Sequence, residues 1–358
     1  YFPKEGHPQA VTRFDGTRIT PGFLQAIAYE VYVKNVTFGL LHQWLGDMGM
    51  TVSENTLRNW LKKGRKYLDR MVVELKRIAL EKDAVVNCDE TWCKVRKYDR
   101  YKKCYMWVLV NKAERVVIFF YEDGSRGRDV LTNFLGDAEL KALMSDGYNA
   151  YVFIGDELKT HRYKDTDHQV CLAHVRAKFV KARMEGGDKR ADVFLDNINR
   201  LFRFEREYDR EMITDGERTR RRQGLPTMEA MINLRANLLQ ELKSEEEQKS
   251  CYMREALNYL HKFWNEAFTY IKDGRYPISN NLAERAVRPF TTKRKNSLHF
   301  GSDEGAEIAA VYHSIISTVK LQGRSAWDYL GKFFTGIFNG CRDFLSLTPQ
   351  NIDLAVCQ

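Results

Sequence analysis

The sequence lacks any run of about 18 apolar residues, the length that a helix needs to cross a bilayer. It also lacks a charged-then-apolar leader, so no signal peptide is visible. None of its seven cysteines forms a Cys-x-x-Cys pair, and an odd number does not make a closed disulfide framework. We therefore expect a cytoplasmic protein with reduced thiols and no membrane contact.

What the sequence contains is typical of a globular protein. Its 358 residues leave room for two or three domains, and 44% hydrophobic content with six Trp argues for packed cores. The net charge of +9 arises from 57 basic and 48 acidic residues. That excess is modest and fits any soluble basic protein, so it becomes informative only where the positive charge clusters. No internal repeat or low-complexity tract is present.

Residues 1–81 are predicted to form a helical, helix-turn-helix-like DNA-binding region after an irregular stretch at 1–20. Apolar residues at helical spacing indicate a first helix, and Gly49 supplies a turn. Thr51 and Glu54 have the capping-box spacing of a second helix, with Gly64 as its stop and another charged helix over 65–81. Arg58 and Lys62 point outward on this reading. A plain helical hairpin with a solvated basic face explains the pattern equally well. The apolar faces of the two predicted helices consist of Leu40, Leu41, Trp44 and Leu45 in the first helix and of Leu57, Trp60 and Leu61 in the second.

The central residues predict a mixed α/β core in two parts, 82–185 and 275–322, interrupted by a helical insertion at 186–274. Elements are expected in the order strand, hairpin, helix, strand, helix, strand. A helical segment at 323–358 closes the chain. The strands are expected at 84–88, 101–110, 115–121, up to Asp146, and 169–172, with helices at 128–135 and from His174.

Three carboxylates stand at the positions that a two-metal phosphoryl-transfer site requires. Asp89 and Asp146 each close a predicted strand, and Glu284 lies on the polar face of a helix. Two Mg²⁺ ions roughly 3.5–4 Å apart prefer such oxygen ligands and serve phosphodiester cleavage. We expect Mg²⁺, with Mn²⁺ able to substitute, and no organic cofactor.

Each acid also has an ordinary structural explanation. Asp89 can pair with Lys94 or Arg96, and Glu90 beside it is a rival ligand. Asp146-Gly147 is a turn dipeptide, and Glu284 can complete an N-terminal cap begun by Asn281. Their joint occurrence in the order Asp, Asp, Glu on suitable elements favours the metal site.

Positive charge clusters on the helix that carries Glu284. An apolar stripe of Leu282, Ala286 and Phe290, with Ala283 and Val287, is expected to be buried. The opposite face and its continuation would suit phosphate contacts, and consist of Asn281, Arg285, Arg288, Lys293, Arg294, Lys295 and Asn296. Cys171 and His174 stand at the end of a predicted strand in the same block. Two ligands at this spacing are only weak evidence for a zinc site. His174 is either a buried histidine with its hydrogen bonds satisfied or an imidazole near the scissile phosphate.

These motifs resemble the IS66 family of bacterial insertion-sequence transposases. The resemblance runs from about residue 20 to the C-terminus, and Asn-Asn-x-Ala-Glu-Arg is its most specific motif. Ser297 and Lys293 depart from the family pattern. The matching motifs are Asp89-Glu-Thr, Ser-Asp146-Gly-Tyr, Cys171-Leu-Ala-His174-Val-Arg176, Asn-Asn-Leu-Ala-Glu284-Arg-Ala-Val-Arg288-Pro, Arg294-Lys-Asn296 and Phe300-Gly-Ser302.

The resemblance implies an RNase H-like core, a mixed five-stranded sheet with flanking helices, in which Asp89, Asp146 and Glu284 bind metal. It also implies that the family's N-terminal zinc-binding region is missing here, in keeping with Tyr1 as first residue. The expected function is DNA end cleavage and strand transfer, acting on terminal inverted repeats and target DNA. A homo-oligomer on DNA and accessory proteins of the same element are expected partners. The alternatives are a catalytically silent transposase-derived DNA-binding protein, or an RNase H-like nuclease without joining activity.

Overall fold

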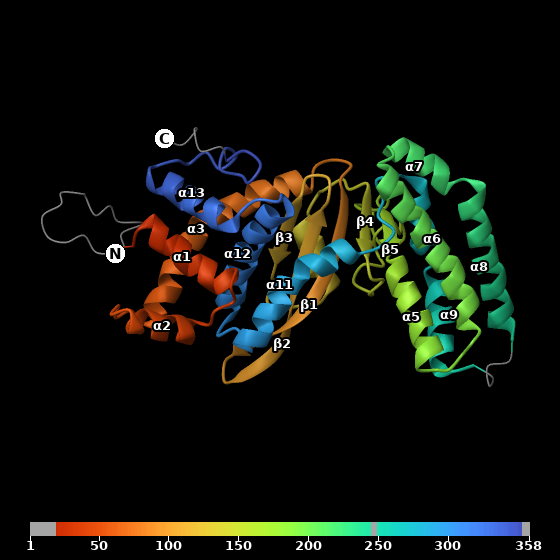
Figure 1. The fold of residues 1–358 in the computed structure, drawn as a ribbon, viewed down its shortest axis with the longest axis horizontal. Helices are drawn as coiled ribbons and strands as arrows, with labels where there is room; N and C mark the ends of the chain where they lie inside the picture. The colour runs from red at the N-terminus through yellow and green to blue at the C-terminus, as the bar shows by residue number, and fades with distance from the viewer. Residues whose placement is uncertain (1–18, 245–248, 353–358) are drawn as a thin grey trace, which may run out of the picture.

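A five-stranded mixed sheet forms the centre of the protein in the computed structural model, which describes residues 19–244 and 249–352 (Figure 1). The strand order is β3-β2-β1-β4-β5. The first three strands pair antiparallel, whereas β4 and β5 extend the sheet in parallel from β1. The bounds are β1 Val85–Lys97, β2 Arg100–Asn111, β3 Val116–Phe120, β4 Ala142–Ser145 and β5 Asp167–Val170. The prediction of a mixed α/β core with five strands is confirmed.

Strand β1 is much longer than predicted, so Asp89 lies within it and does not close it. β1 pairs with β2 from Val86 to Lys97, whereas β4 pairs only with Val85–Asn87. Beyond Asp89 the buried residues Cys93 and Val95 alternate with exposed neighbours, the period of a half-buried strand. A second difference follows β4. Residues 146–166 form turns, where the predicted order placed a helix before the next strand.

Three N-terminal helices pack beside the sheet: α1 (Pro21–Tyr32), α2 (Phe38–Asp47) and α3 (Glu54–Ala79). The cap of α3 is Ser53, whose hydroxyl accepts from the Thr56 amide, so the predicted cap at Thr51 is wrong by two residues. Gly64 does not end this helix. It is buried within α3, and the two helices expected at 51–64 and 65–81 are one. In α2 only Leu41 and Leu45 of the predicted stripe are buried. The expected stretch at 1–20 lies almost wholly outside the described residues.

Helices fill the chain between β5 and the Glu284 helix, and they lie at one end of the molecule, beyond β5 (Figure 1). They share a hydrophobic core that also includes Ala142 of β4. The Arg222 guanidinium is buried against Glu205 at 2.7 Å and donates to the carbonyls of Tyr270, Asp273 and Tyr276, which joins the end of this segment to α6 and α7. The elements are α5 Leu172–Met184, α6 Ala191–Glu211, α7 Asp215–Arg222, α8 Leu225–Lys243, α9 Cys251–Lys262, α10 Trp264–Phe268 and the 3₁₀ helix η3 Thr269–Lys272.

The two faces of the sheet are covered by different helices. Helices α11 (Asn281–Ser297) and α12 (Asp303–Leu321) cover one face of β1–β3, where Val95 packs with Ala283 and Phe290. On the other face Cys88 packs in the cluster that includes α4 (Arg128–Leu135). Helix α13 (Ala326–Phe338) follows α12 and packs against α1. No helix among the described residues is long and apolar enough to cross a membrane.

Candidate metal centre and nucleic-acid surface

Strand alternation sends the adjacent acids Asp89 and Glu90 to opposite faces of the sheet. Asn87, Cys93 and Val95 face α11, so Asp89 shares their side, whereas Glu90 follows Cys88 to the other face. There the Glu90 carboxylate, 1% exposed, pairs with Arg126 at 2.6 Å and accepts from the Tyr151 hydroxyl. Glu90 is therefore engaged in a buried polar network, and Asp89 is the acid available to α11.

Asp146 follows β4 at a sharp turn. Its carboxylate accepts the Tyr148 amide at 2.9 Å, and its carbonyl accepts from the Tyr259 hydroxyl on α9. Gly147 has φ +80°, and a Cβ there would lie 2.9 Å from the Tyr259 oxygen, so glycine is needed for both backbone and space. Asp146-Gly147 thus forms a turn, as the structural explanation of this dipeptide predicted. The turn also fixes a carboxylate next to the end of β4.

Glu284 is placed by Asn280, a fully buried residue that precedes α11. The Asn280 amide nitrogen donates to the Cys88 carbonyl, and its amide oxygen accepts from the Asn87 side chain, both at 2.9 Å. These bonds hold the start of α11 against β1. Glu284 follows one turn later, since its amide donates to the Asn280 carbonyl. Neither Asn280 nor Asn87 is among the site residues predicted from the sequence. An Asn inside the apolar run Val85-Val86-Asn87-Cys88 was the available signal, because a buried amide requires partners.

The three predicted metal ligands interact electrostatically. Burial, together with the negative charges of Glu90, Asp146 and Glu284, raises the pKa of Asp89 to about 8. A buried carboxylate surrounded by other acids fits a cation site, because a bound cation favours the charged form. Among the described residues, the potential metal ligands whose atoms lie within 4.8 Å of one another are Cys171, His174 and Glu284. The carboxylate oxygens of Asp89 and Asp146 do not belong to this group. Acids on either side of two ions need not touch one another.

Cys171 and His174 lie beside Glu284, with His174 Nδ1 3.8 Å from Glu284 Oε1. The His174 side chain is 40% exposed. Its Nδ1 atom is nevertheless buried and has no hydrogen-bond partner among the described residues. His174 is therefore not the buried, satisfied histidine of the ordinary explanation.

The basic residues predicted to form one surface on α11 differ in their exposure and in their contacts. Arg285, Arg288 and Lys295 are exposed, and within the described part of the chain none has an ion-pair partner. Arg294 packs on the Trp92 ring at 4.0 Å and donates to the Trp92 carbonyl at 2.7 Å. Arg285 lines a cavity of about 730 Å³ between the start of β1 and α7.

Lys293 departs from the prediction of a phosphate contact because it is only 5% exposed. Its ammonium donates to the Val31 carbonyl at 2.6 Å and lies 4.6 Å from the Tyr32 ring centroid. Burial lowers the pKa of Lys293 to about 7. Lys293 thus joins α11 to α1 and is not exposed for DNA.

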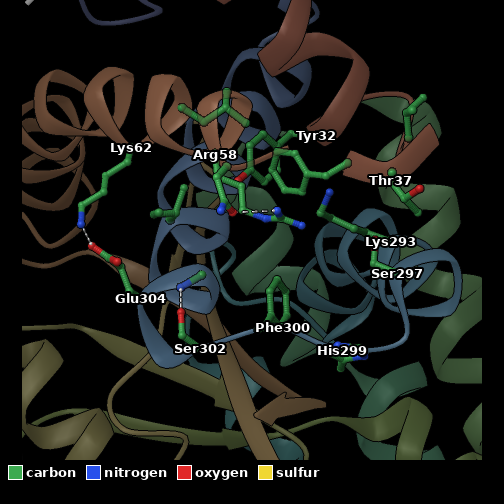
Figure 2. Close-up of a pocket in the computed structure, with 18 of the residues that line it drawn as sticks. Tyr32, Thr37, Arg58, Lys62, Lys293, Ser297, His299, Phe300, Ser302 and Glu304 are labelled. Carbon is green, nitrogen blue, oxygen red and sulfur yellow. Dashed lines mark hydrogen bonds and ion pairs between the residues drawn. The ribbon is translucent and has the colours of Figure 1, made fainter. Parts of the chain in front are cut away.

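A cleft of about 780 Å³ separates α2 and α3 from the loop that joins α11 to α12 (Figure 2). Arg58 and Lys62 line it from α3, in keeping with their predicted outward positions, and Asn296 lines it from α11. Each of the two cations already has an acidic partner, since Arg58 pairs with Glu54 at 2.6 Å and Lys62 with Glu304 at 2.5 Å. Phosphate binding by either residue would replace a surface ion pair of little stability.

Comparisons with known proteins identify a family. The profile of the family described as "Transposase IS66 family" matches residues 16–308, most of the chain. The protein is thus of the transposase class. The chain belongs to the IS66 family, as the resemblance of its motifs predicted.

Two relatives from Sinorhizobium fredii (strain NBRC 101917 / NGR234) illustrate how this chain relates to longer proteins. The first, "Uncharacterized protein y4jD", is 25% identical over 350 residues, covering 92% of this chain and 65% of the relative. The second, "Uncharacterized protein y4qI", is 27% identical over 239 residues, covering 66% of this chain and 43% of the relative. The chain thus spans two-thirds or less of the length of these relatives.

Proposed function

We propose that this chain carries the catalytic core of a DNA transposase of the DDE type, which cleaves element ends and transfers them to target DNA. The observation that carries the proposal is that Asp89 on β1 is buried near the Asp146 turn after β4 and the start of α11, where the negative charges of Asp146 and Glu284 contribute to its raised pKa. An antiparallel β1–β3 meander followed by parallel β4 and β5 supports an RNase H-like core.

In this proposal Asp89, Asp146 and Glu284 hold two Mg²⁺ ions, with Mn²⁺ able to substitute. When bound, these ions neutralise charge on the scissile phosphate and on the leaving oxygen. The chain's own contribution is rigidity, because β1, the Gly147 turn and the Asn280 hydrogen bonds fix the three carboxylates before DNA arrives. The same site serves two reactions: cleavage by water, which frees a 3′-hydroxyl, and in-line attack of that hydroxyl on target DNA.

DNA contacts are assigned to the exposed cations around this site. Arg285, Arg288 and Lys295 on α11 would bind phosphates, with Arg294 and Asn296 beside them. Arg58 and Lys62 would contact DNA from the cleft of Figure 2, with α2 and α3 recognising terminal repeats in a helix-turn-helix-like manner. Bringing two element ends together requires at least two subunits on DNA, and accessory proteins of the same element are further expected partners.

The first test is Mg²⁺-dependent joining of a pre-cut, labelled element end into plasmid DNA. Wild type should join, and Glu284→Gln should lower joining by at least a hundredfold, because it removes a charged metal ligand without changing size. Glu90→Gln is the matched control, since this acid faces Arg126 on the other side of the sheet. Its joining should stay within a few fold of wild type.

Other products would favour the two alternatives. Nicking without joining supports an RNase H-like nuclease. Tight DNA binding with neither product, even with the accessory proteins and the full-length protein supplied, supports a catalytically silent DNA-binding protein. Equal joining by wild type and Glu284→Gln would contradict the proposed triad.

A further inference from the structure

A compact group of soft and hard metal-ligand atoms lies beside the proposed Mg²⁺ site. Cys171, His174 and Glu284 bring a thiol, an imidazole and a carboxylate within 4.8 Å of one another. They come from two elements more than a hundred positions apart in the sequence, the start of α5 and the first turn of α11. The proposed function uses only Glu284 of the three as a ligand, so the other two donors require an explanation.

The backbone holds these donors in a fixed arrangement. Cys171 and His174 are three residues apart at the start of α5, which places them on one side of the helix. The Leu172 amide donates to the Ile278 carbonyl at 3.2 Å, and the Asn280 amide donates to the Cys171 sulfur at 3.1 Å. The segment leading into α11 is thus bonded directly to the residues that carry the thiol and the imidazole.

The surroundings of Cys171 suit a metal-bound thiolate. Its side chain is fully buried, and the Asn280 amide donates to its sulfur at 3.1 Å. Such a donor stabilises negative charge on sulfur, and a divalent cation supplies the remaining compensation inside a protein.

His174 presents an unused ligand atom to the same point. Its Nδ1 is buried and has no hydrogen-bond partner among the described residues, while the ring is 40% exposed, so Nδ1 faces inward. The 3.8 Å between Nδ1 and Glu284 Oε1 is too long for a hydrogen bond. In a tetrahedral zinc site, with ligands about 2.0–2.3 Å from the ion, neighbouring donors lie roughly 3.3–3.8 Å apart. The distance between Nδ1 and Oε1 is therefore close to what such an ion requires.

We propose that Cys171, His174 and Glu284 bind a zinc-class divalent cation, with the fourth position open to water. The donor set selects against Mg²⁺, which takes oxygen ligands in octahedral geometry, and favours Zn²⁺ or Co²⁺. Because Glu284 belongs to both donor sets, zinc binding draws this carboxylate away from Asp89 and Asp146 and inhibits the reaction. This last consequence rests on the proposed function, whereas the site itself does not.

Cobalt titration of the full chain tests the site without any DNA reaction. Co²⁺ should bind one to one, with visible absorption typical of tetrahedral coordination and a thiolate-to-metal band in the near ultraviolet, and Zn²⁺ should displace it. Cys171→Ser should abolish the thiolate band, and His174→Gln should weaken binding roughly tenfold or more, since each removes a direct ligand. Glu284→Gln should weaken it by a similar factor.

The matched control is Cys251→Ser, because Cys251 is exposed on α9 and lies outside the group. Its cobalt spectrum should equal that of wild type. His174→Gln replaces a partly exposed side chain, so its far-ultraviolet circular dichroism and melting temperature should stay near those of wild type. Absence of a thiolate band in wild type, or the same band in Cys171→Ser and His174→Gln, would overturn the proposal. Cobalt binding in a protein that joins no DNA would leave the site standing and count only against the proposed function.

Discussion

At the scale of single residues, buried amides decide where the third carboxylate lies. Asn280 is fully buried and bonds to Asn87 and to the Cys88 carbonyl, so the start of α11 cannot shift along β1 without leaving polar groups unpaired. The position of Glu284 relative to Asp89 therefore depends on residues that take no direct part in the proposed chemistry.

The effect of burial on the pKa of a single side chain can be tested at Lys293. Its contacts with the Val31 carbonyl and the Tyr32 ring favour the protonated form, but burial outweighs them and lowers the pKa to about 7. Between about pH 7 and the ordinary value of 10.5, the unfolded chain thus binds a proton that the folded protein does not. The stability of wild type relative to Lys293→Met should rise by about 1.4 kcal/mol per pH unit in this window.

Urea denaturation of both proteins at about pH 7.5, 8.5 and 9.5 measures this difference. Lys295→Met is the control, because Lys295 is exposed two positions along the same helix. Its stability relative to wild type should not change with pH. A pH-independent difference for Lys293→Met would show that the ammonium remains charged in the folded protein.

At the scale of elements, helix α3 continues through a glycine because another helix packs closely there. A Cβ on Gly64 would lie 2.6 Å from the Tyr312 hydroxyl oxygen, and that hydroxyl donates to the Leu61 carbonyl on α3. Glycine usually weakens a helix interior, so a sequence pattern favours a stop at this position. Packing of α12 against α3 makes the small residue necessary and offsets its cost.

Gly64→Ala should therefore destabilise the protein by about 1–3 kcal/mol, since steric overlap with Tyr312 exceeds the gain in helix propensity. Tyr312→Phe removes the oxygen that the new methyl group meets. The double variant should recover part of the loss, which a double-mutant cycle of urea-unfolding free energies measures. Strict additivity of the two changes would contradict this account of the contact.

At the scale of the whole molecule, the helices beyond β5 also support the candidate site. Tyr259 on α9 donates to the Asp146 carbonyl, and Cys171 begins α5 and contacts Asn280. The segment between β5 and α11 therefore supports Asp146 and the residues next to Glu284. The net charge of +9 is spread over the chain, so local clusters of positive charge, such as the one on α11, bear on the proposed DNA binding more than the total does.

The salt dependence of DNA binding tests that distribution. If Arg288 and Lys295 each contact a phosphate, the double variant Arg288→Gln with Lys295→Gln should lower the slope of log affinity against log salt by about 2. Fluorescence anisotropy with labelled duplex DNA over a range of salt concentrations measures the slope. Arg206→Gln with Arg210→Gln on α6 removes the same charge from exposed positions away from α11. An equal change in both double variants would indicate a general charge effect and no particular DNA surface.

The amino-acid sequence alone determined the elements and motifs of this protein. Apolar runs of strand length predicted five strands, helical spacing predicted the helices of 186–274, and the motifs around Asp89, Asp146 and Glu284 predicted the family. These features could be predicted because periodicity and turn residues act locally. Boundaries could not be predicted in the same way. The strand predicted at 84–88 extends to Lys97, because its pairing with β2 decides how far β1 extends.

Tertiary structure alone decided what surrounds each candidate residue. The basic run on α11 reads as one surface, but packing against α1 buries Lys293, and Trp92 covers Arg294. Likewise, Cys171 and Glu284 are far apart in sequence, and only the hydrogen bonds around Asn280 bring them together. The physical reason is that burial and charge interactions depend on distance in space, which neighbouring positions in a sequence do not specify.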